Sequence, residues 1–143
     1  TLLPEQYENF KTRFEAVVKE TIDKQLLVPE LTIDLPITFA EITPKFYRLL
    51  KKMAPFGPGN MKPVFMSDEV SDTGYAKCVG SDNSHLKANL KQINSHPISA
   101  IGFGLGNKIN ILKRGEPFKV AYALDENEWQ GNTTLQLLVK DIK

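Results

Sequence analysis

The sequence predicts an α+β protein in which helical segments precede a small barrel of about five strands. The apolar residues recur every three or four positions up to residue 53 and mostly every second position after residue 64. A segment rich in proline and glycine, PFGPGNMKPVF at residues 55–65, separates the two patterns. Five short strands with one helix after the third is the element order of an OB-fold, a Greek-key barrel. An SH3-like barrel and a plain α+β sandwich remain open as alternatives at this point.

Length and composition describe an ordinary globular chain. Its 143 residues suffice for one domain, or for a small domain with helical attachments, and its 41% hydrophobic residues suffice for a core. The net charge of +1 indicates no class of partner. The single cysteine, Cys78, cannot form an internal disulfide, and the sequence has neither a long apolar run nor a signal-peptide pattern. We therefore expect a cytoplasmic protein, and the start at Thr1 leads us to expect a piece of a longer one.

The first third of the chain predicts two helices. In PEQYENFKTRFEAVVKETI, at residues 4–22, apolar residues recur at spacings of three and four, and Pro4 suits a first turn. A helix this short is marginal alone, so its apolar side needs a partner surface. TPKFYRLLKKM predicts a second helix, with Thr43 as N-cap and Pro44 in the first position. Between them, alternation over residues 31–35 predicts a short strand.

The proline- and glycine-rich segment predicts a stiff joint between the second helix and the barrel. Its three prolines fix φ, whereas Gly57 and Gly59 permit the turns between them. Asn60 is expected to tie the turn with a side-chain hydrogen bond. A structural role is therefore favoured over contact with a ligand.

The rest of the chain predicts the strands of the barrel. The clearest is HLKANLKQ, in which Leu86, Ala88 and Leu90 alternate with polar residues. The other expected strands are VFMSDEV with YAKCVG (one interrupted strand or two short ones), ISAIGFG, PFKVAYALD and NTTLQLLVKDI. GNKINILKRG is expected to be a short helix or loop, and ENEWQG a turn. One strand face is expected in the core and consists of Phe118, Val120, Tyr122 and Leu124.

The sequence contains no recognisable catalytic constellation or metal site. His85 and His96 have no carboxylate pair between them, and His85 is expected at the surface. Cys78 is interpreted as a small buried hydrophobe. Ser84 and His85 are expected to point to opposite faces of a strand, which excludes a nucleophile–base pair. The glycines of GFGLGN lack the spacing of a phosphate loop and are expected to lead a strand into a helix.

Basic residues concentrate between residues 77 and 119. This stretch holds seven Lys and Arg residues against two acidic ones, and the chain on either side compensates the excess. A local basic patch on a near-neutral module suits a groove that follows a phosphate backbone. A merely solvated face of the barrel is the alternative interpretation.

Exposed aromatic residues would complete such a surface, because bases stack on them for about 1–3 kcal/mol each. Trp129 lies between the last two expected strands, in the loop that OB-folds commonly use for ligand contact. It is either a stacking residue or a hydrophobic plug that closes the hairpin. Phe103 shares a strand face with Ile101 by parity and is expected in the core.

Several strings in the chain resemble one known family. They are LVPELTIDLPITFAEIT, LLKKMAPFGPGNMKPVF, HLKANL, AIGFG and LDENEWQGNTTLQLLVKDI. Together they resemble the C-terminal region of RecJ, a family of bacterial single-strand-specific 5′-to-3′ DNA exonucleases in the DHH phosphoesterase superfamily. The resemblance extends from about residue 3 to the end of the chain. Its most specific part is the order of PFGPGN…PVF and NEWQG…LQL…DI.

The resemblance implies a domain arrangement, and it implies that catalysis and DNA binding belong to different domains. Residues 1–34 would end a DHH-associated domain, residues 35–59 would be a connecting helix and joint, and residues 60–143 would be the OB-fold. The catalytic DHH motifs, which use Mn²⁺ or Mg²⁺, are absent from this sequence, so the fragment itself is expected to be inactive. In a RecJ-type enzyme of DNA repair and recombination, the OB-fold would hold single-stranded DNA. It is also a candidate contact for single-stranded-DNA-binding protein.

The residues expected to contact DNA are few. They are Lys87, Lys91, Lys113 and Arg114 for phosphates and Trp129 for base stacking. Many family members carry arginines around the last hairpin, where this sequence has Gln130 and Thr133. This departure argues against phosphate contacts from basic residues of the hairpin. It favours contacts from the lysines of HLKANLK and from LKRG instead. The alternative function is an interdomain or protein-interaction module with no tight DNA binding of its own.

Overall fold

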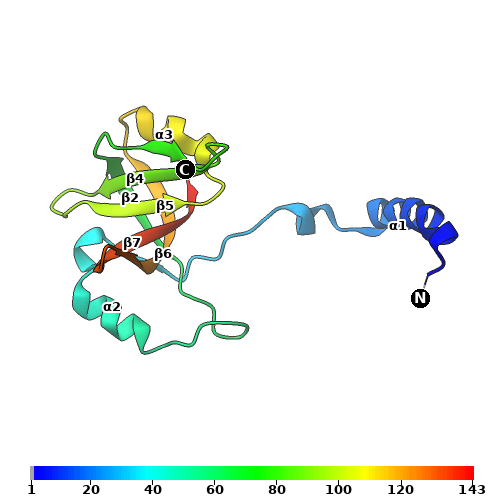
Figure 1. Cartoon of the computed structure of the whole chain (residues 1–143), viewed down its shortest axis with the longest axis horizontal. Helices are drawn as coiled ribbons and strands as arrows, with labels where there is room; N and C mark the ends of the chain where they lie inside the picture. Colours follow the sequence, from blue (N-terminus) through cyan, green and yellow to red (C-terminus); the bar gives the residue numbers. More distant parts are fainter. Residues whose placement is uncertain (1) are drawn as a thin grey trace. The chain divides into compact units, whose positions relative to one another are not determined.

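The computed structural model describes residues 2–143, apart from the side chains of Gln25 and Trp129. The chain divides into two compact units, Thr1–Leu31 and Thr32–Lys143. Figure 1 shows the helices of the first unit in blue and the strands of the second from green to red.

Unit 1 is helical, as the spacing of its apolar residues predicts. A turn of 3₁₀-helix, η1 (Pro4–Gln6), leads into α1 (Tyr7–Thr21), and a second 3₁₀ turn, η2 (Lys24–Leu27), follows. Phe10 and Phe14 stack with their ring centroids 5.6 Å apart. No residue of α1 is buried, so the apolar stripe finds no partner among the described residues of its own unit.

Unit 2 is built around a closed barrel (Figure 1). Its strands are β1 (Leu35–Pro36), β2 (Phe65–Asp72), β3 (Lys77–Val79), β4 (His85–Lys91), β5 (Ile98–Gly102), β6 (Phe118–Trp129) and β7 (Asn132–Ile142). They lie in the order β1-β2-β6-β7-β5-β4-β3, and β2 also pairs with β4, which closes the sheet. The pair β5–β7 is parallel, whereas the barrel's other pairs are antiparallel. This Greek-key barrel is the predicted OB-fold, and the helices that precede it complete the α+β class.

Two of the seven strands are short additions to the five of the barrel. The strand expected over residues 31–35 is reduced to β1, which pairs in parallel with β2 at Leu35↔Phe65. Ahead of β1, Asp34 holds the chain against β2 instead, because its carboxylate accepts from the Val64 N–H at 2.8 Å. At the other edge, β3 pairs with β4 over three residues. The interrupted strand of the prediction is thus two strands, β2 and β3.

The core of the barrel comes from the alternating positions of its strands. Leu86, Ala88 and Leu90 are buried, as the pattern of β4 predicts. The predicted inner face of β6 is also buried and consists of Phe118, Val120, Tyr122 and Leu124. The Tyr122 hydroxyl lies 2.8 Å from Ser67 Oγ, which in turn donates to the Ile37 carbonyl at 2.6 Å. Burial raises the pKa of Tyr122 to about 12, so this network stays protonated over the physiological range.

The helix that precedes the joint is α2 (Pro44–Lys51). It begins directly after Thr43, the residue predicted as its N-cap. Thr43 Oγ1 accepts a hydrogen bond from the Phe46 N–H at 3.1 Å. The Phe46 ring packs edge-on against Phe65 of β2, with centroids 5.6 Å apart, and Leu50 is buried. α2 is therefore part of the same packed unit as the barrel.

The joint after α2 is closed by the predicted side-chain hydrogen bond. Asn60 Nδ2 donates to the Met53 carbonyl at 2.8 Å and to the Pro55 carbonyl at 2.9 Å. Gly57 and Asn60 also exchange two backbone hydrogen bonds of 2.9 Å. The carboxamide thus ties together the segment that follows α2, because it satisfies the carbonyls of two residues beyond the helix.

Asn60→Ala should lower the free energy of unfolding by about 1 kcal/mol, because two hydrogen bonds at the end of α2 are lost together. Urea unfolding followed by circular dichroism measures the change. Asn110→Ala is the control, since Asn110 is exposed on α3 and its side chain makes no hydrogen bond to the described residues. Equal midpoints for the two variants would contradict the role given to Asn60.

The β6–β7 hairpin is longer than predicted. ENEWQG is not a loop, because β6 continues to Trp129 and pairs with β7 as far as Trp129↔Asn132. Only Gln130 and Gly131 form the turn, both with positive φ (50° and 77°), as two-residue hairpins require. The prediction failed here because this ribbon is solvated on both faces, so its residues need not alternate between apolar and polar.

The segment after β5 closes one end of the barrel. GFGLGN leads from β5 through a 3₁₀ turn, η4 (Gly106–Lys108), into α3 (Ile109–Lys113), as predicted for its glycines. Leu112 of α3 is buried and meets Leu86 and Ala88 inside the barrel. Gly106 is required by packing, because a Cβ there would collide with the backbone carbonyl of Asn83.

Candidate nucleic-acid interface

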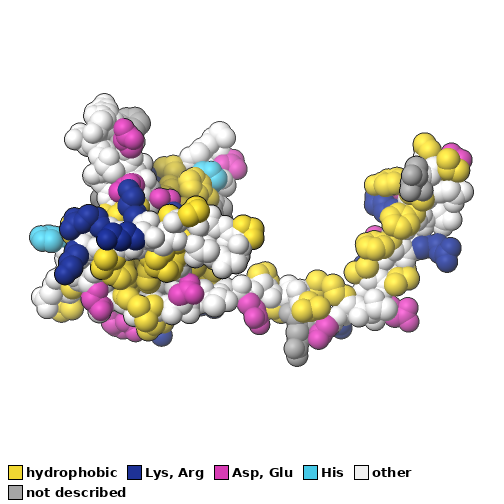
Figure 2. All heavy atoms as spheres, turned by 90° about the horizontal axis from the view of Figure 1, so that it is seen from below, with side chains coloured by type: hydrophobic (Ala, Val, Ile, Leu, Met, Phe, Trp, Pro, Cys, Tyr) yellow, Lys and Arg dark blue, Asp and Glu magenta, His cyan; other side chains and the backbone are white. Residues whose placement is uncertain are grey.

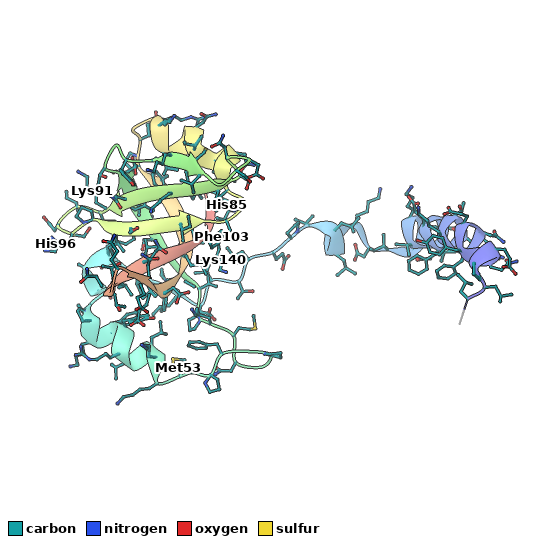
Figure 3. The ribbon with its side chains drawn as sticks, in the orientation of Figure 1. Met53, His85, Lys91, His96, Phe103 and Lys140 are labelled. Atoms are coloured by element: carbon teal, nitrogen blue, oxygen red, sulfur yellow. The ribbon has the colours of Figure 1, made fainter. Side chains whose placement is uncertain are left out.

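The outward face of β4 and β5 presents a surface of polar, basic and aromatic side chains, which we call the strand face. Pairing places Lys87 opposite Ile101 and Asn89 opposite Ser99. The parallel β5–β7 pair extends this face to β7 through Ile101↔Leu138. The residues that define it are Lys77, His85, Lys87, Asn89, Lys91, Ser99, Ile101, Phe103, Gln136, Leu138 and Lys140. Figure 3 labels His85, Lys91, Phe103 and Lys140 on it.

Two lysines of the strand face lie directly opposite each other. Lys77 of β3 pairs with Lys87 of β4, and like charges in this position repel. Lys77 Nζ also lies 4.9 Å from the ring centre of Tyr75 and lowers the pKa of its hydroxyl. This pairing places two cations on neighbouring strands of the strand face.

Phe103 lies on the strand face and not in the core, which corrects the prediction from parity. Its side chain is 63% exposed. It does share a face with Ile101, but that face is the outer one, because the inward positions of β5 are the small Ala100 and Gly102. A Cβ at Gly102 would meet Leu105, so the interior has no room for a large residue there.

His85 braces the exposed ring of Phe103. The two rings meet edge to face, with centroids 5.2 Å apart and planes at 80°. His85 Nδ1 accepts from the Gly104 N–H at 3.2 Å, which fixes the ring beside Phe103. Phe103 is thus held upright beside lysines on an open surface, which sequence periodicity alone did not reveal.

Ser84 and His85 do form a hydrogen bond, contrary to the prediction. Ser84 Oγ lies 3.0 Å from His85 Nδ1. Strand alternation does not apply, because β4 begins at His85 and Ser84 belongs to a turn in which Asp82 Oδ1 accepts its N–H at 3.1 Å. Hydrogen bonds from Ser84 lower the pKa of Asp82. The carboxylate therefore orients the serine and not the histidine, which is not the arrangement of a catalytic triad.

The structure separates the five residues predicted to contact DNA. Lys87 and Lys91 both lie on the strand face. Lys113 and Arg114 lie at the end of α3, and Figure 1 shows this helix at one end of the barrel. The backbone of Trp129 ends β6, but its side chain lies outside the described residues. Cys78 is half-buried, and its thiol lies 3.5 Å from the Gly106 carbonyl.

A second basic region, missed at the sequence level, lies on α2. This helix and its C-cap carry Lys45, Arg48, Lys51 and Lys52 and no acidic residue. Figure 2, which views the barrel from the side of α2, shows most of the visible lysine and arginine side chains of unit 2 in one cluster. The signal was hidden because the first 59 residues sum to zero: outside α2 and its C-cap, eight acidic residues stand against four basic ones. Lys51 binds Glu126 of β6 at 3.0 Å.

The described residues form no cluster of three or more histidine, cysteine, aspartate or glutamate side chains that could hold a metal ion. None of the described helices is long and apolar enough to cross a membrane. The exposed side chains of unit 2 include cations, amides and the aromatic rings of Tyr75 and Phe103, all of which can take part in binding.

The family model for the RecJ OB domain matches residues 33–141. The chain belongs to the RecJ OB domain family. The resemblance to RecJ found in its sequence strings is thereby confirmed. The match begins close to the start of unit 2, so it includes β1 and α2 together with the barrel. The division into residues 1–34, 35–59 and 60–143 stays a prediction.

Whole RecJ proteins are much longer than this chain. The single-stranded-DNA-specific exonuclease RecJ of Salmonella typhimurium is 30% identical over 138 residues, which are 96% of this chain and 23% of that protein. The RecJ of Escherichia coli is 29% identical over 143 residues, or 99% of this chain and 24% of that protein. The chain thus spans about a quarter of the curated relatives it matches.

A solved structure has the same fold. The crystal structure of RecJ in complex with Mn²⁺ from Thermus thermophilus superposes with a TM-score of 0.67 at 22% identity. The match covers all of this chain and 20% of that one.

Proposed function

We propose that the OB barrel binds single-stranded DNA on the strand face, as part of a longer RecJ-type 5′-to-3′ exonuclease that acts in DNA repair and recombination. The observation that carries this proposal is Phe103, an exposed ring that His85 braces beside the opposed cations Lys77 and Lys87. Bases stack on such rings for about 1–3 kcal/mol each, while cations along the backbone neutralise phosphates. Lys91 extends the phosphate track along β4, and Lys140 extends it on β7.

The other residues predicted to contact DNA have secondary places in this proposal. Lys113 and Arg114 would receive the strand where it leaves the face toward the end of α3. Trp129 would stack a base at the tip of the β6–β7 hairpin.

The catalytic work belongs, in this proposal, to parts of the protein outside the described residues. A RecJ-type nuclease hydrolyses phosphodiesters with Mn²⁺ or Mg²⁺, and the side chains described here offer no cluster to hold such an ion. We assign residues 1–34 to the end of a DHH-associated domain, whose remainder would cover the apolar stripe of α1. A cytoplasmic location agrees with the single free cysteine.

Fluorescence anisotropy with labelled single-stranded and duplex DNA of one length, at two salt concentrations, tests the proposal. Binding should prefer the single strand and should weaken with salt at a log–log slope of about −0.7 per phosphate contact. Phe103→Ala should lower the affinity at least about fivefold, because one stacking contact is lost. Ile93→Ala is the matched control, since Ile93 is the most exposed large hydrophobic residue described near the strand face. Absence of binding by the folded chain at low salt would overturn the proposal.

A second candidate is an interdomain or protein-interaction module that does not bind DNA tightly. It is favoured by apolar side chains left exposed on α2 and in the joint, namely Leu49, Met53 and Met61. Figure 3 shows Met53 at the end of α2. Single-stranded-DNA-binding protein is one partner for such a surface. Its retention by the chain, with no direct binding of DNA, would favour this candidate over the first.

A further inference from the structure

A groove of about 710 Å³ lies between α2, the β4–β5 hairpin and the β6–β7 hairpin. Its volume is within the range of about 300–1,000 Å³ that is usual for small-molecule sites. α2 contributes Tyr47 and Arg48, and the hairpin of β4 and β5 contributes Asn89, Pro97 and Ser99. We call this site the α2 groove.

Four hydrogen-bonding groups of the α2 groove have no partner among the residues that the structure describes. They are the hydroxyls of Tyr47 and Thr133, the Arg48 guanidinium and the Asn89 carboxamide. Burial and the nearby Glu126 raise the pKa of the Tyr47 hydroxyl, so it remains a donor. Glu126, the acidic residue of the groove, is neutralised by Lys51 at 3.0 Å. The groove therefore offers one uncompensated positive charge together with neutral donors and acceptors.

The wall of the α2 groove is apolar and contains ring side chains. Tyr47, Pro97 and Ile98 all contribute to it. A flat heterocycle can pack on such a wall, while a carboxamide offers a donor and an acceptor to its edge. A guanidinium is the side chain best suited to a phosphate, which it can bind through two parallel hydrogen bonds. These three features together match one nucleotide.

We propose that the α2 groove binds one nucleotide of a single strand, with the base against Tyr47 and Pro97, Asn89 at the base edge and Arg48 on the phosphate. This proposal rests on the proposed function and assigns it a second subsite. The occupant follows from continuity, because Asn89 and Ser99 belong both to the groove and to the strand face.

The path of the DNA strand follows from the residues that the strand face and the α2 groove share. Phe103 and His85 lie at one end of the strand face, and the α2 groove opens beyond Asn89 toward the other. β4 rises about 3.3 Å per residue, so its seven residues separate the two ends by roughly 20 Å. Lys87 lies between them. A single DNA strand that stacks on Phe103 and runs along β4 would thus reach the α2 groove within the footprint of about 4–16 nucleotides found for one OB-fold.

Charge favours a polyanion in the groove over a neutral partner. Lys45, Arg48 and Lys52 of α2 form no salt bridge within the described part of the chain, and each is exposed. An acidic peptide would share the attraction to these cations. The groove shares Asn89 and Ser99 with the strand face, to which we assign single-stranded DNA, so we commit to a nucleotide and make the peptide an outcome of the test.

The test uses nitrogen-15 NMR of the whole chain with oligothymidylate, together with affinities of two variants. The side-chain signals of Asn89 and Arg48 should shift with the backbone signals around Phe103. Arg48→Ala should lower the affinity about tenfold or more, because a charge-assisted hydrogen bond to phosphate is lost. Lys45→Ala removes the same charge from α2 outside the groove lining, and should cost about twofold or less because an exposed cation is screened.

The outcomes separate this inference from the proposed function. Shifts around Phe103 alone, with equal effects of the two variants, would overturn the groove and leave the strand face standing. No shifts anywhere would overturn both. Shifts of Asn89 and Arg48 with an acidic peptide, but not with oligothymidylate, would reassign the groove to protein recognition.

Discussion

Reversing Lys87 and Lys91 to glutamate should lower the affinity for single-stranded DNA by about 100-fold at low salt, because each change removes a charge-assisted contact and adds a repulsion. The salt slope should also become shallower by about 1.4, which corresponds to two phosphate contacts. The fold should persist, since Lys87→Glu places a carboxylate opposite Lys77 and replaces a repulsive cross-strand pair with an attractive one. Anisotropy titrations at several salt concentrations measure both effects.

The control for this double variant must change the net charge equally. Lys11→Glu with Lys24→Glu does so in unit 1, which contributes no residue to the strand face. If both doubles weaken binding alike, the effect is one of overall charge. If neither weakens binding while both remain folded, β4 is not part of the DNA site.

Gly106→Ala should lower the free energy of unfolding by about 1–3 kcal/mol, because the added methyl group overpacks a contact between two backbone segments. The Gly106 N–H donates to the Ser84 carbonyl at 2.8 Å, so η4 cannot withdraw without losing this bond. A new Cβ would collide with the Asn83 carbonyl, which is backbone and cannot rotate away. Thermal unfolding should show a melting temperature lower by several degrees.

Gly57→Ala provides the matched control for Gly106→Ala. A Cβ at Gly57 would meet nothing within 4 Å, and the expected change in stability is about 0.5 kcal/mol or less. Equal stability of the two variants would mean that the 83–84 turn moves freely, and the geometry of His85 described above would then be wrong.

The local patterns that the sequence predicts well are those decided by near neighbours. Thr43 caps α2 because its hydroxyl reaches an N–H three residues on, and Asn60 ties the joint within its own turn. The inner faces of β4 and β6 follow from alternation alone. The topology of the barrel could be predicted because five strands and one helix in this sequence order have few other closed arrangements.

The features that the sequence did not predict depend on contacts between distant segments. Phe103 has the right parity, but which face of β5 is inner depends on Leu105 and α3. The α2 groove could not be predicted from the sequence, because residues of α2 and of two hairpins line it together. The β6–β7 ribbon was missed because strands that are solvated on both faces carry no amphipathic pattern.

The buried bond from Ser67 to the Ile37 carbonyl determines how much chain would have to be transplanted with the barrel. Ser67 Oγ also contacts the Tyr122 hydroxyl in the middle of the core. Gln92 fastens the same segment from another side, since its carboxamide accepts the Phe39 N–H at 2.6 Å. A graft of the barrel alone onto a foreign protein would remove the carbonyl that accepts from the Ser67 hydroxyl and the N–H that donates to the Gln92 carboxamide. The smallest portable piece therefore starts ahead of Ile37 and carries α2 and its cations with it.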